Sequence, residues 1–134
     1  MLKAILDTNI WISGLLLSSL TKPIVDAHAE RKFLPIVSPD TIKELNQTLK
    51  KPRIRKLIAE DKAAEFLKFL DGASRLMEPS ISLKVCRDPD DDAFISLAAS
   101  AKIPLVSLDK DVLVLRGQID VEILHPKEFI KRLG

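Results

Sequence analysis

The chain has 134 residues, 46% hydrophobic and 30% charged, with a formal net charge of +2 at pH 7. This length predicts one domain over residues 1–134, and the absence of any apolar run near the roughly 20 residues of a bilayer span excludes a membrane protein. Cys86 is the only cysteine, which excludes an internal disulfide and a thiolate zinc site. Asp7 interrupts the first apolar stretch, which argues against a secretory signal. We therefore expect a cytoplasmic protein.

Short apolar runs alternate along the chain with longer segments of helical periodicity. Continuous rather than alternating apolar character is typical of strands that are covered on both faces. In chain order, the first half predicts a strand over Leu2–Leu6, an apolar helix over Asn9–Ser18, a short helix over Pro23–Ala29 and a strand over Phe33–Val37.

A helix start follows the second strand, because Ser38 is a good N-cap residue and Pro39 suits the first helical position. This helix has an apolar stripe of Ile42, Leu45 and Leu49 and ends or kinks at Pro52, and a second helix runs from Asp61 to about Gly72. A strand over Leu83–Cys86 follows, and then a helix after Asp88-Pro89 that buries Phe94, Leu97 and Ala98. The last elements are strands over Pro104–Leu108 and Val121–Leu124 and a helix from Pro126.

Strands that alternate with helices predict an α/β three-layer sandwich, with a small, mainly parallel sheet of four to five strands flanked by helices. Ligands gather at the carboxyl ends of the strands in such sheets. Asp7 follows the first strand and Asp109 follows the strand over Pro104–Leu108. The fold would therefore place these two acids on the same edge of the sheet.

The segment Asp88–Asp92 holds four acids in five positions. A helix N-terminus favours an acid by about 0.3–1 kcal/mol, which explains Asp88 and one of Asp90 and Asp91. Mutual repulsion among four carboxylates opposes that gain, and a bound divalent cation would relieve it. We therefore interpret the cluster, which Asp92 closes, as part of a metal site for chemistry on a phosphodiester.

Simpler interpretations of these residues stay open. Asp7 is also a plausible N-cap for the helix that follows, while Asn9 could orient Asp7 or bind a metal-bound water. Asp109 and Asp111 also suit a simple turn after a strand. Glu44 lies off the apolar stripe of its helix, where most glutamates are simply solvated.

A basic run follows the helix that carries Glu44. Basic flanks around an acidic centre suit a polyanion that is held by its backbone. A solvated helix junction is the alternative, and the charges alone do not decide between the two. The residues that would bind RNA are Lys50, Lys51, Arg53 and Arg55.

Four motifs resemble, in order, those of PIN-domain proteins. The similar segments are Ile5–Asn9, Ser38–Leu45, Asp88–Ile95 and Val106–Asp111, and they carry the matched acids Asp7, Glu44, Asp92 and Asp109. The ending Ile123–Phe129 is similar to the branch that contains toxins of toxin–antitoxin systems, related to VapC-like toxins. Ser107 stands where threonine is usual. The motifs do not decide between Asp109 and Asp111, nor whether Asp88 or Asp91 assists Asp92.

The resemblance implies an endoribonuclease that uses Mg²⁺ or Mn²⁺. Asp7, Asp92 and Asp109 would hold the metal, with Glu44 bound directly or through water. The supporting residues would be Asn9, Ser107, Asp88, Asp91 and Asp111. Members of this branch are often homodimers and are often silenced by an antitoxin in the cleft, so the expected partners are RNA, a cognate antitoxin and a second copy of the chain.

Two other functions are alternatives to the nuclease. A phosphatase with Asp7 as its nucleophile would usually have a second aspartate two residues on, where this chain has Asn9. A non-catalytic module would bind metal or a basic partner without turnover, but no acid is missing from the motifs to favour it.

Overall fold

Five short strands form an all-parallel sheet in the order β3-β2-β1-β4-β5 in the computed structural model, which describes residues 1–134. The strands are β1 (Lys3–Leu6), β2 (Leu34–Val37), β3 (Arg75–Leu76), β4 (Leu105–Val106) and β5 (Ile123–Leu124). Because helices flank this sheet on both faces, the predicted three-layer α/β fold is confirmed.

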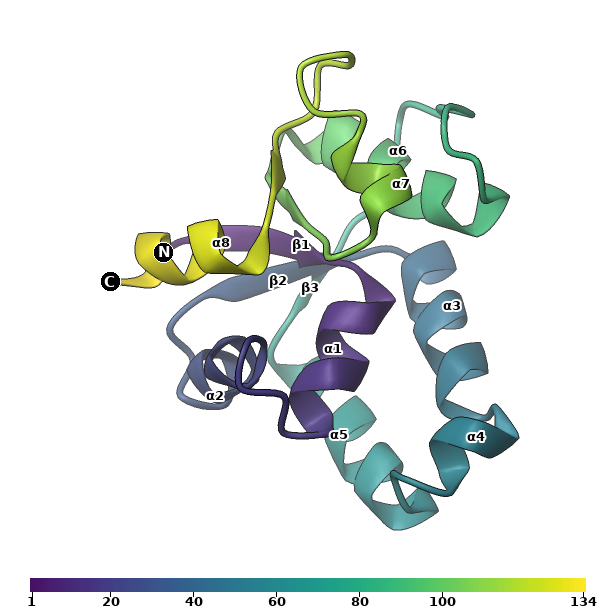
Figure 1. The fold of residues 1–134 in the computed structure, drawn as a ribbon, viewed down its shortest axis with the longest axis vertical. Coiled ribbons are helices and arrows are strands. Elements are labelled where there is room, and N and C mark those ends of the chain that lie inside the picture. The colour runs from purple at the N-terminus through teal and green to yellow at the C-terminus, as the bar shows by residue number, and fades with distance from the viewer.

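The helices fall on the two faces of the sheet, as Figure 1 shows. They are α1 (Thr8–Leu15), α2 (Lys22–Ala29), α3 (Pro39–Leu49), α4 (Pro52–Arg55), α5 (Glu60–Gly72), the 3-10 turn η1 (Pro89–Asp91), α6 (Asp92–Ala101), α7 (Lys110–Leu113) and α8 (Pro126–Leu133). Helices α6 and α7 cover one face, and α1, α2, α3, α5 and α8 contribute to the core on the other. None of these helices has the length and hydrophobicity that a transmembrane span requires.

Alternation of side chains along the strands builds a core on each face of the sheet. Ala4 and Leu6 of β1 pack in the larger core with Trp11 of α1, whereas Ile5 packs in the smaller core with Ile95 of α6. Since both faces are covered, the strands appear in the sequence as continuous apolar runs. Only the ends of the strands are left to present polar side chains.

Local signals in the sequence fix the helices that surround the site. The Ser38 hydroxyl accepts a hydrogen bond from the Thr41 amide at 3.2 Å, and the Thr41 hydroxyl accepts one from the Ser38 amide at 2.8 Å. This reciprocal cap begins α3 directly after β2. Helix α1 approaches α2 closely at Gly14, where an added Cβ would lie 2.3 Å from Cγ2 of Val25.

One predicted element is wrong: no strand forms over Leu83–Cys86. The third strand is the exposed pair Arg75–Leu76, which pairs with β2. The Leu83–Cys86 segment instead runs irregularly beside α6, whose Asp92 and Ser96 side chains accept hydrogen bonds from its amides. Amides bound in this way cannot join a sheet.

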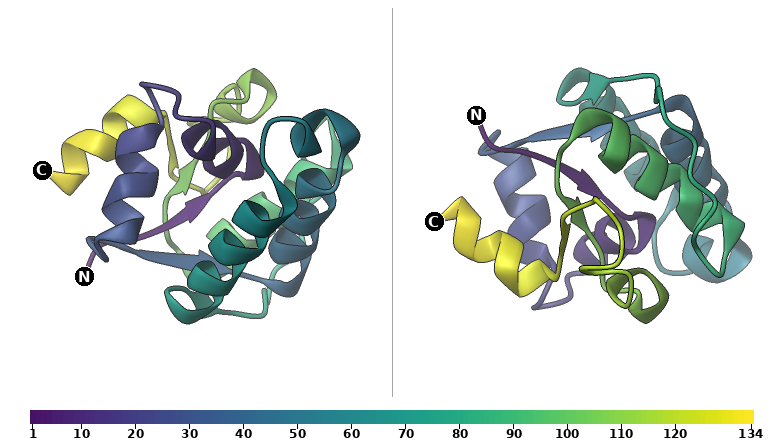
Figure 2. Two further views of the ribbon diagram at one scale, coloured as in Figure 1. Left: turned by 90° about the horizontal axis from the view of Figure 1, so that it is seen from below. Right: turned by 90° about the horizontal axis from the view of Figure 1, so that it is seen from above.

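The two chain ends lie on the same side of the molecule in all three views of Figures 1 and 2. Strand β1 runs away from this side, so its carboxyl end reaches the opposite edge of the sheet. The acids that follow the strands are therefore far from both ends of the described chain.

Candidate metal centre

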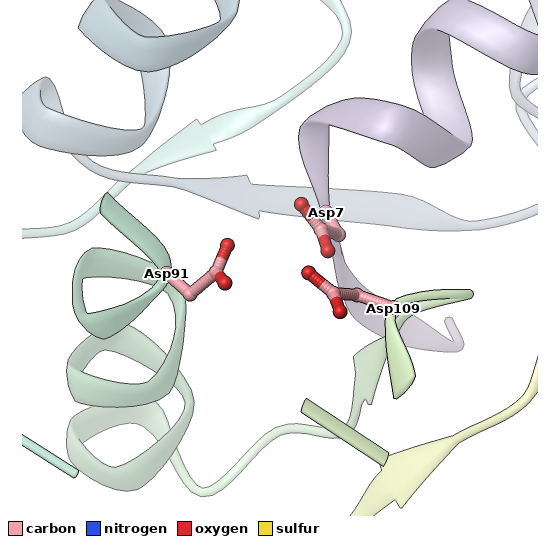
Figure 3. A group of neighbouring side chains, drawn as sticks. All are labelled: Asp7, Asp91 and Asp109. Atoms are coloured by element: carbon pink, nitrogen blue, oxygen red, sulfur yellow. The ribbon is translucent and has the colours of Figure 1, made fainter. Parts of the chain in front are cut away.

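Asp7, Asp91 and Asp109 converge at the carboxyl edge of the sheet. One carboxylate oxygen from each lies within 4.8 Å of those from the other two, and Figure 3 shows the three side chains pointing toward one another. Asp7 follows β1, Asp109 follows β4, and Asp91 ends the turn η1. Because β1 and β4 are neighbouring parallel strands, Leu6 opposite Val106, their ends emerge together.

Asp7 is buried, with 4% of its surface exposed. Its side chain makes no capping hydrogen bond to α1, although the Thr8 and Asn9 amides lie close enough to lower its pKa. Its Oδ2 accepts a hydrogen bond of 2.8 Å from the Ser107 hydroxyl. Burial raises the pKa of Asp7, the Ser107 hydrogen bond opposes this rise, and the nearby Asp109 charge adds to it.

Asp91 completes the group, although the sequence motif predicts only a supporting role for it. It is half-buried and makes no capping bond to α6. Burial, followed by the charges of Asp7 and Asp109, raises the pKa of Asp91 to about 7. Three carboxylates at this spacing therefore repel one another when all are charged, unless a cation lies between them.

Asp109 has a double role. Its Oδ1 accepts a hydrogen bond of 2.9 Å from the Asp111 amide, which caps α7, and its own amide donates to the Ser107 hydroxyl at 3.0 Å. The turn interpretation thus describes one of its oxygens correctly, yet the side chain also reaches Asp7 and Asp91. Asp111 is exposed and outside the group, so the geometry favours Asp109 of the two.

Ser107 is the link between two of the acids, because its buried hydroxyl donates to Asp7 and accepts from the Asp109 amide. We expect Ser107→Ala to weaken Mn²⁺ binding by about 10–100-fold, as the loss of an outer-shell partner does elsewhere. Calorimetric titration with Mn²⁺ measures this. Ser107→Thr keeps the hydroxyl and is the matched control. Unchanged binding in Ser107→Ala would show that the hydroxyl does not organise the site.

Asp92 is not brought to the other carboxylates. Its Oδ1 accepts hydrogen bonds from the Val85 amide at 3.0 Å and the Cys86 amide at 2.8 Å. Asp91, one position earlier, occupies the place that the motif resemblance predicts for Asp92. The reason is local: the turn η1 passes into α6 between these two residues, so their side chains leave in different directions.

Glu44 also lies outside the group of three. It is half-buried on α3, in a groove of about 910 Å³ that Asp90 and Asp92 help to line. Burial raises the pKa of Glu44 and the Asp90 charge adds to this, while Lys51 opposes it. Asp88 caps η1 by accepting a 3.0 Å hydrogen bond from the Asp90 amide.

The basic run lies at the end of α3 and in α4, where Lys50, Lys51 and Arg53 are exposed. Arg55 is held within the fold instead: its Nε donates to the Leu49 carbonyl at 3.2 Å, and its guanidinium lies 3.4 Å from Glu60. Asn9 is exposed in the first turn of α1, close in sequence to Asp7.

The three acids offer oxygen ligands only, which hard divalent cations such as Mg²⁺ and Mn²⁺ prefer. A buried carboxylate with a raised pKa, facing two others, is the arrangement that a divalent charge would stabilise. The residues present therefore fit a divalent metal ion.

The fold and the acidic group together define an α/β domain with a candidate divalent-metal site at the carboxyl edge of its sheet. A family model described as PIN domain matches residues 3–111, and the chain belongs to this family. PIN domains are generally metal-dependent nucleases. The uncharacterized protein MJ1680 of Methanocaldococcus jannaschii is 31% identical over 140 residues, which cover 97% of this chain and 90% of that protein.

The fold is also similar to the crystal structure of PAE2754 from Pyrobaculum aerophilum. The match has a TM-score of 0.61 at 18% identity and covers 98% of this chain and 89% of that chain. At this identity the likeness concerns the fold alone.

Proposed function

We propose that this chain is an endoribonuclease that hydrolyses RNA phosphodiester bonds with the help of Mg²⁺ or Mn²⁺. The observation that carries the proposal is the convergence of Asp7, Asp91 and Asp109, with oxygens within 4.8 Å of one another, in a PIN domain. A bound divalent ion would lower the pKa of a water molecule and neutralise charge on the scissile phosphate.

The protein side chains would divide the remaining work. Asp7, Asp91 and Asp109 would hold the ion, and Ser107 would keep Asp7 and the Asp109 backbone in register through its two hydrogen bonds. Glu44, set apart in its groove, would act only through water. The carboxylates must be deprotonated to bind a cation, so the raised pKa of Asp91, about 7, makes metal binding release a proton near neutral pH.

RNA would be held through its backbone by the exposed cations Lys50, Lys51 and Arg53. Such contacts bind phosphates without regard to sequence and weaken as salt rises. Arg55, which pairs with Glu60, would contribute mainly to the fold.

The role of a toxin in a toxin–antitoxin pair, acting as a homodimer, is part of the same proposal. It is supported by the resemblance of the C-terminal segment to that branch. The homodimer is also supported by an apolar groove between α1, α2 and α5, in which the exposed side chains of Leu17 and Leu57 lie near Phe66. A second copy of the chain could cover these side chains. Light scattering should give twice the mass of the chain; a monomer at every concentration would contradict the homodimer.

Cleavage of a mixed, end-labelled RNA pool with Mg²⁺, Mn²⁺ or EDTA tests the activity. We expect cutting by the wild type with either metal, and none with EDTA or in Asp7→Asn. Asp111→Asn is the matched control, because it removes a nearby exposed carboxylate outside the group of three. Cutting that survives Asp7→Asn would contradict the proposed site. Mn²⁺ binding without cleavage of any RNA would favour a metal-binding module without turnover.

A further inference from the structure

One face of α6 holds an irregular segment, residues 80–86, which we call the strap. The strap lies between β3 and η1 and belongs to no strand or helix. Asp92, Ser96 and Ser100 follow one another at intervals of four residues, so they line up on one side of α6. Their oxygens accept hydrogen bonds from backbone amides along the strap.

The two serines hold the first part of the strap. The Ser100 hydroxyl accepts hydrogen bonds from the amides of Ser80 at 3.0 Å and Ile81 at 2.9 Å. The Ser96 hydroxyl accepts one from the Leu83 amide at 2.9 Å. This side-chain ladder takes the place of the strand pairing that the apolar run Leu83–Cys86 would otherwise favour.

Asp92 holds the last part of the strap and thereby closes a loop. Its Oδ1 accepts hydrogen bonds from the amides of Val85 and Cys86. Residues 85 to 92 therefore form a loop whose two ends meet at the start of α6. Asp91 lies inside this loop, one residue before its closing point. Every residue from 87 to 90 is exposed, so no apolar burial anchors the loop there.

We infer that Asp92 is a positioning residue of the metal centre: its carboxylate closes the loop that carries Asp91 and does not itself hold the ion. The inference rests on the proposed metal centre. Repulsion by Asp7 and Asp109 tends to push the Asp91 carboxylate away from them. The loop must resist that push in the metal-free protein, and the hydrogen bonds that Asp92 accepts from the Val85 and Cys86 amides tie it back to α6.

Substitution by asparagine separates this role from that of a metal ligand. Asp92→Asn keeps an oxygen at Oδ1 for the two amides but removes the charge, whereas Asp92→Ala removes both. A metal ligand needs the negative charge of its carboxylate, whereas closing the loop needs only an oxygen that accepts the two hydrogen bonds. Asp91→Asn is the reference for the loss of a true ligand.

The experiment combines residue-resolved amide hydrogen exchange of the metal-free protein with Mn²⁺ titration. In Asp92→Ala we expect faster exchange at Val85 and Cys86 and about 10–100-fold weaker Mn²⁺ binding. Asp92→Asn should stay close to the wild type in both. Asp91→Asn should lose Mn²⁺ binding while both amides remain protected.

Ser100→Ala is the matched control, because it opens the far end of the strap. It should speed exchange at Ser80 and Ile81 and leave Mn²⁺ affinity unchanged. Asp92→Asn that weakens Mn²⁺ binding as much as Asp91→Asn would make Asp92 a ligand and overturn the inference, as would unchanged affinity in a folded Asp92→Ala. If Asp92→Ala fails to fold, as judged by exchange in β1, Asp92→Asn alone decides. Wild-type Mn²⁺ affinity in Asp91→Asn would instead refute the proposed metal centre.

Discussion

Replacing Asp91 by asparagine should abolish metal-dependent RNA cleavage and, at the same time, raise the melting temperature of the metal-free protein at neutral pH. Cleavage should fall by more than about 100-fold, because the loss of a ligand exceeds the usual effect of losing an outer-shell partner. The gain in stability follows from removing one of three carboxylates that lie within 4.8 Å of one another.

The sign of the stability change comes from the pKa of Asp91, which is about 7 in the folded chain against an ordinary value of 3.8. Between these values the folded chain binds more protons than the unfolded chain, so the free energy of unfolding falls as pH rises through this window. Asparagine has no such dependence. Because Asp91 is only half-buried, we discount the effect for solvent screening to about 1 kcal/mol, or a shift of about 3–5 °C.

Thermal melts in EDTA at pH 5 and pH 8 measure this effect. The advantage of Asp91→Asn over the wild type should be larger at pH 8, where the wild-type carboxylate is charged. Asp111→Asn, which alters an exposed acid, should melt like the wild type at both values. Added Mn²⁺ should stabilise the wild type by about 2.7 kcal/mol at 100 times its Kd, and should not stabilise Asp91→Asn. Loss of cleavage with a lower melting temperature at pH 8 would make Asp91 a structural residue instead.

His28→Ala should lower the free energy of unfolding by about 3 kcal/mol, since it leaves both a cavity and an unpaired carbonyl. The imidazole is 2% exposed and packs against the rings of Trp11, Phe33 and Phe69. Its Nε2 lies 2.9 Å from the Ala73 carbonyl, which can only accept, so Nε2 carries the proton. This bond ties α2 to the end of α5. Urea unfolding at pH 7.5 measures the loss.

Acid should also destabilise the fold through His28. Burial lowers its pKa from the ordinary 6.5, so below pH 6.5 the unfolded chain binds a proton that the folded chain resists. The free energy of unfolding therefore falls as pH drops through this region, opposite to the effect of Asp91. In Asp91→Asn the free energy of unfolding should fall more steeply with decreasing pH, because the opposing effect of Asp91 is gone. His28→Gln removes the titrating group; an acid loss that persists in it would implicate another residue.

The predictable parts of the fold are those whose stabilising interactions are local or periodic. Strand β1 is buried on both faces, so its sequence is an apolar run that predicts a strand. Ser38-Pro39 predicts the start of α3 through a local cap. The pair Arg75–Leu76 is exposed and becomes a strand only through its pairing with β2, so it carries no pattern. The segment Leu83–Cys86 has the pattern of a strand, but side chains of α6 bind its amides.

The same distinction applies to the site. Asp7 and Asp109 could be predicted because acids at the ends of parallel strands share an edge. Asp91 could not be separated from Asp92, because neighbouring residues point about 100° apart around a helix and the choice depends on where η1 passes into α6. That point depends on the Asp88 cap and on the loop that Asp92 closes, neither of which periodicity reveals.

The order of strands in the sheet has a consequence for the newly made chain. Strand β1 pairs first with β2, where Lys3 faces Leu34, and on its other edge with β4, where Ile5 faces Leu105. Closing the second pairing joins Asp7 to Ser107, which are 100 residues apart, and a loop of that length closes at a greater entropic cost than the first. The carboxylate cluster depends on this second pairing, because Asp109 follows β4. A nascent chain of this protein would carry no metal centre until residue 109 had emerged.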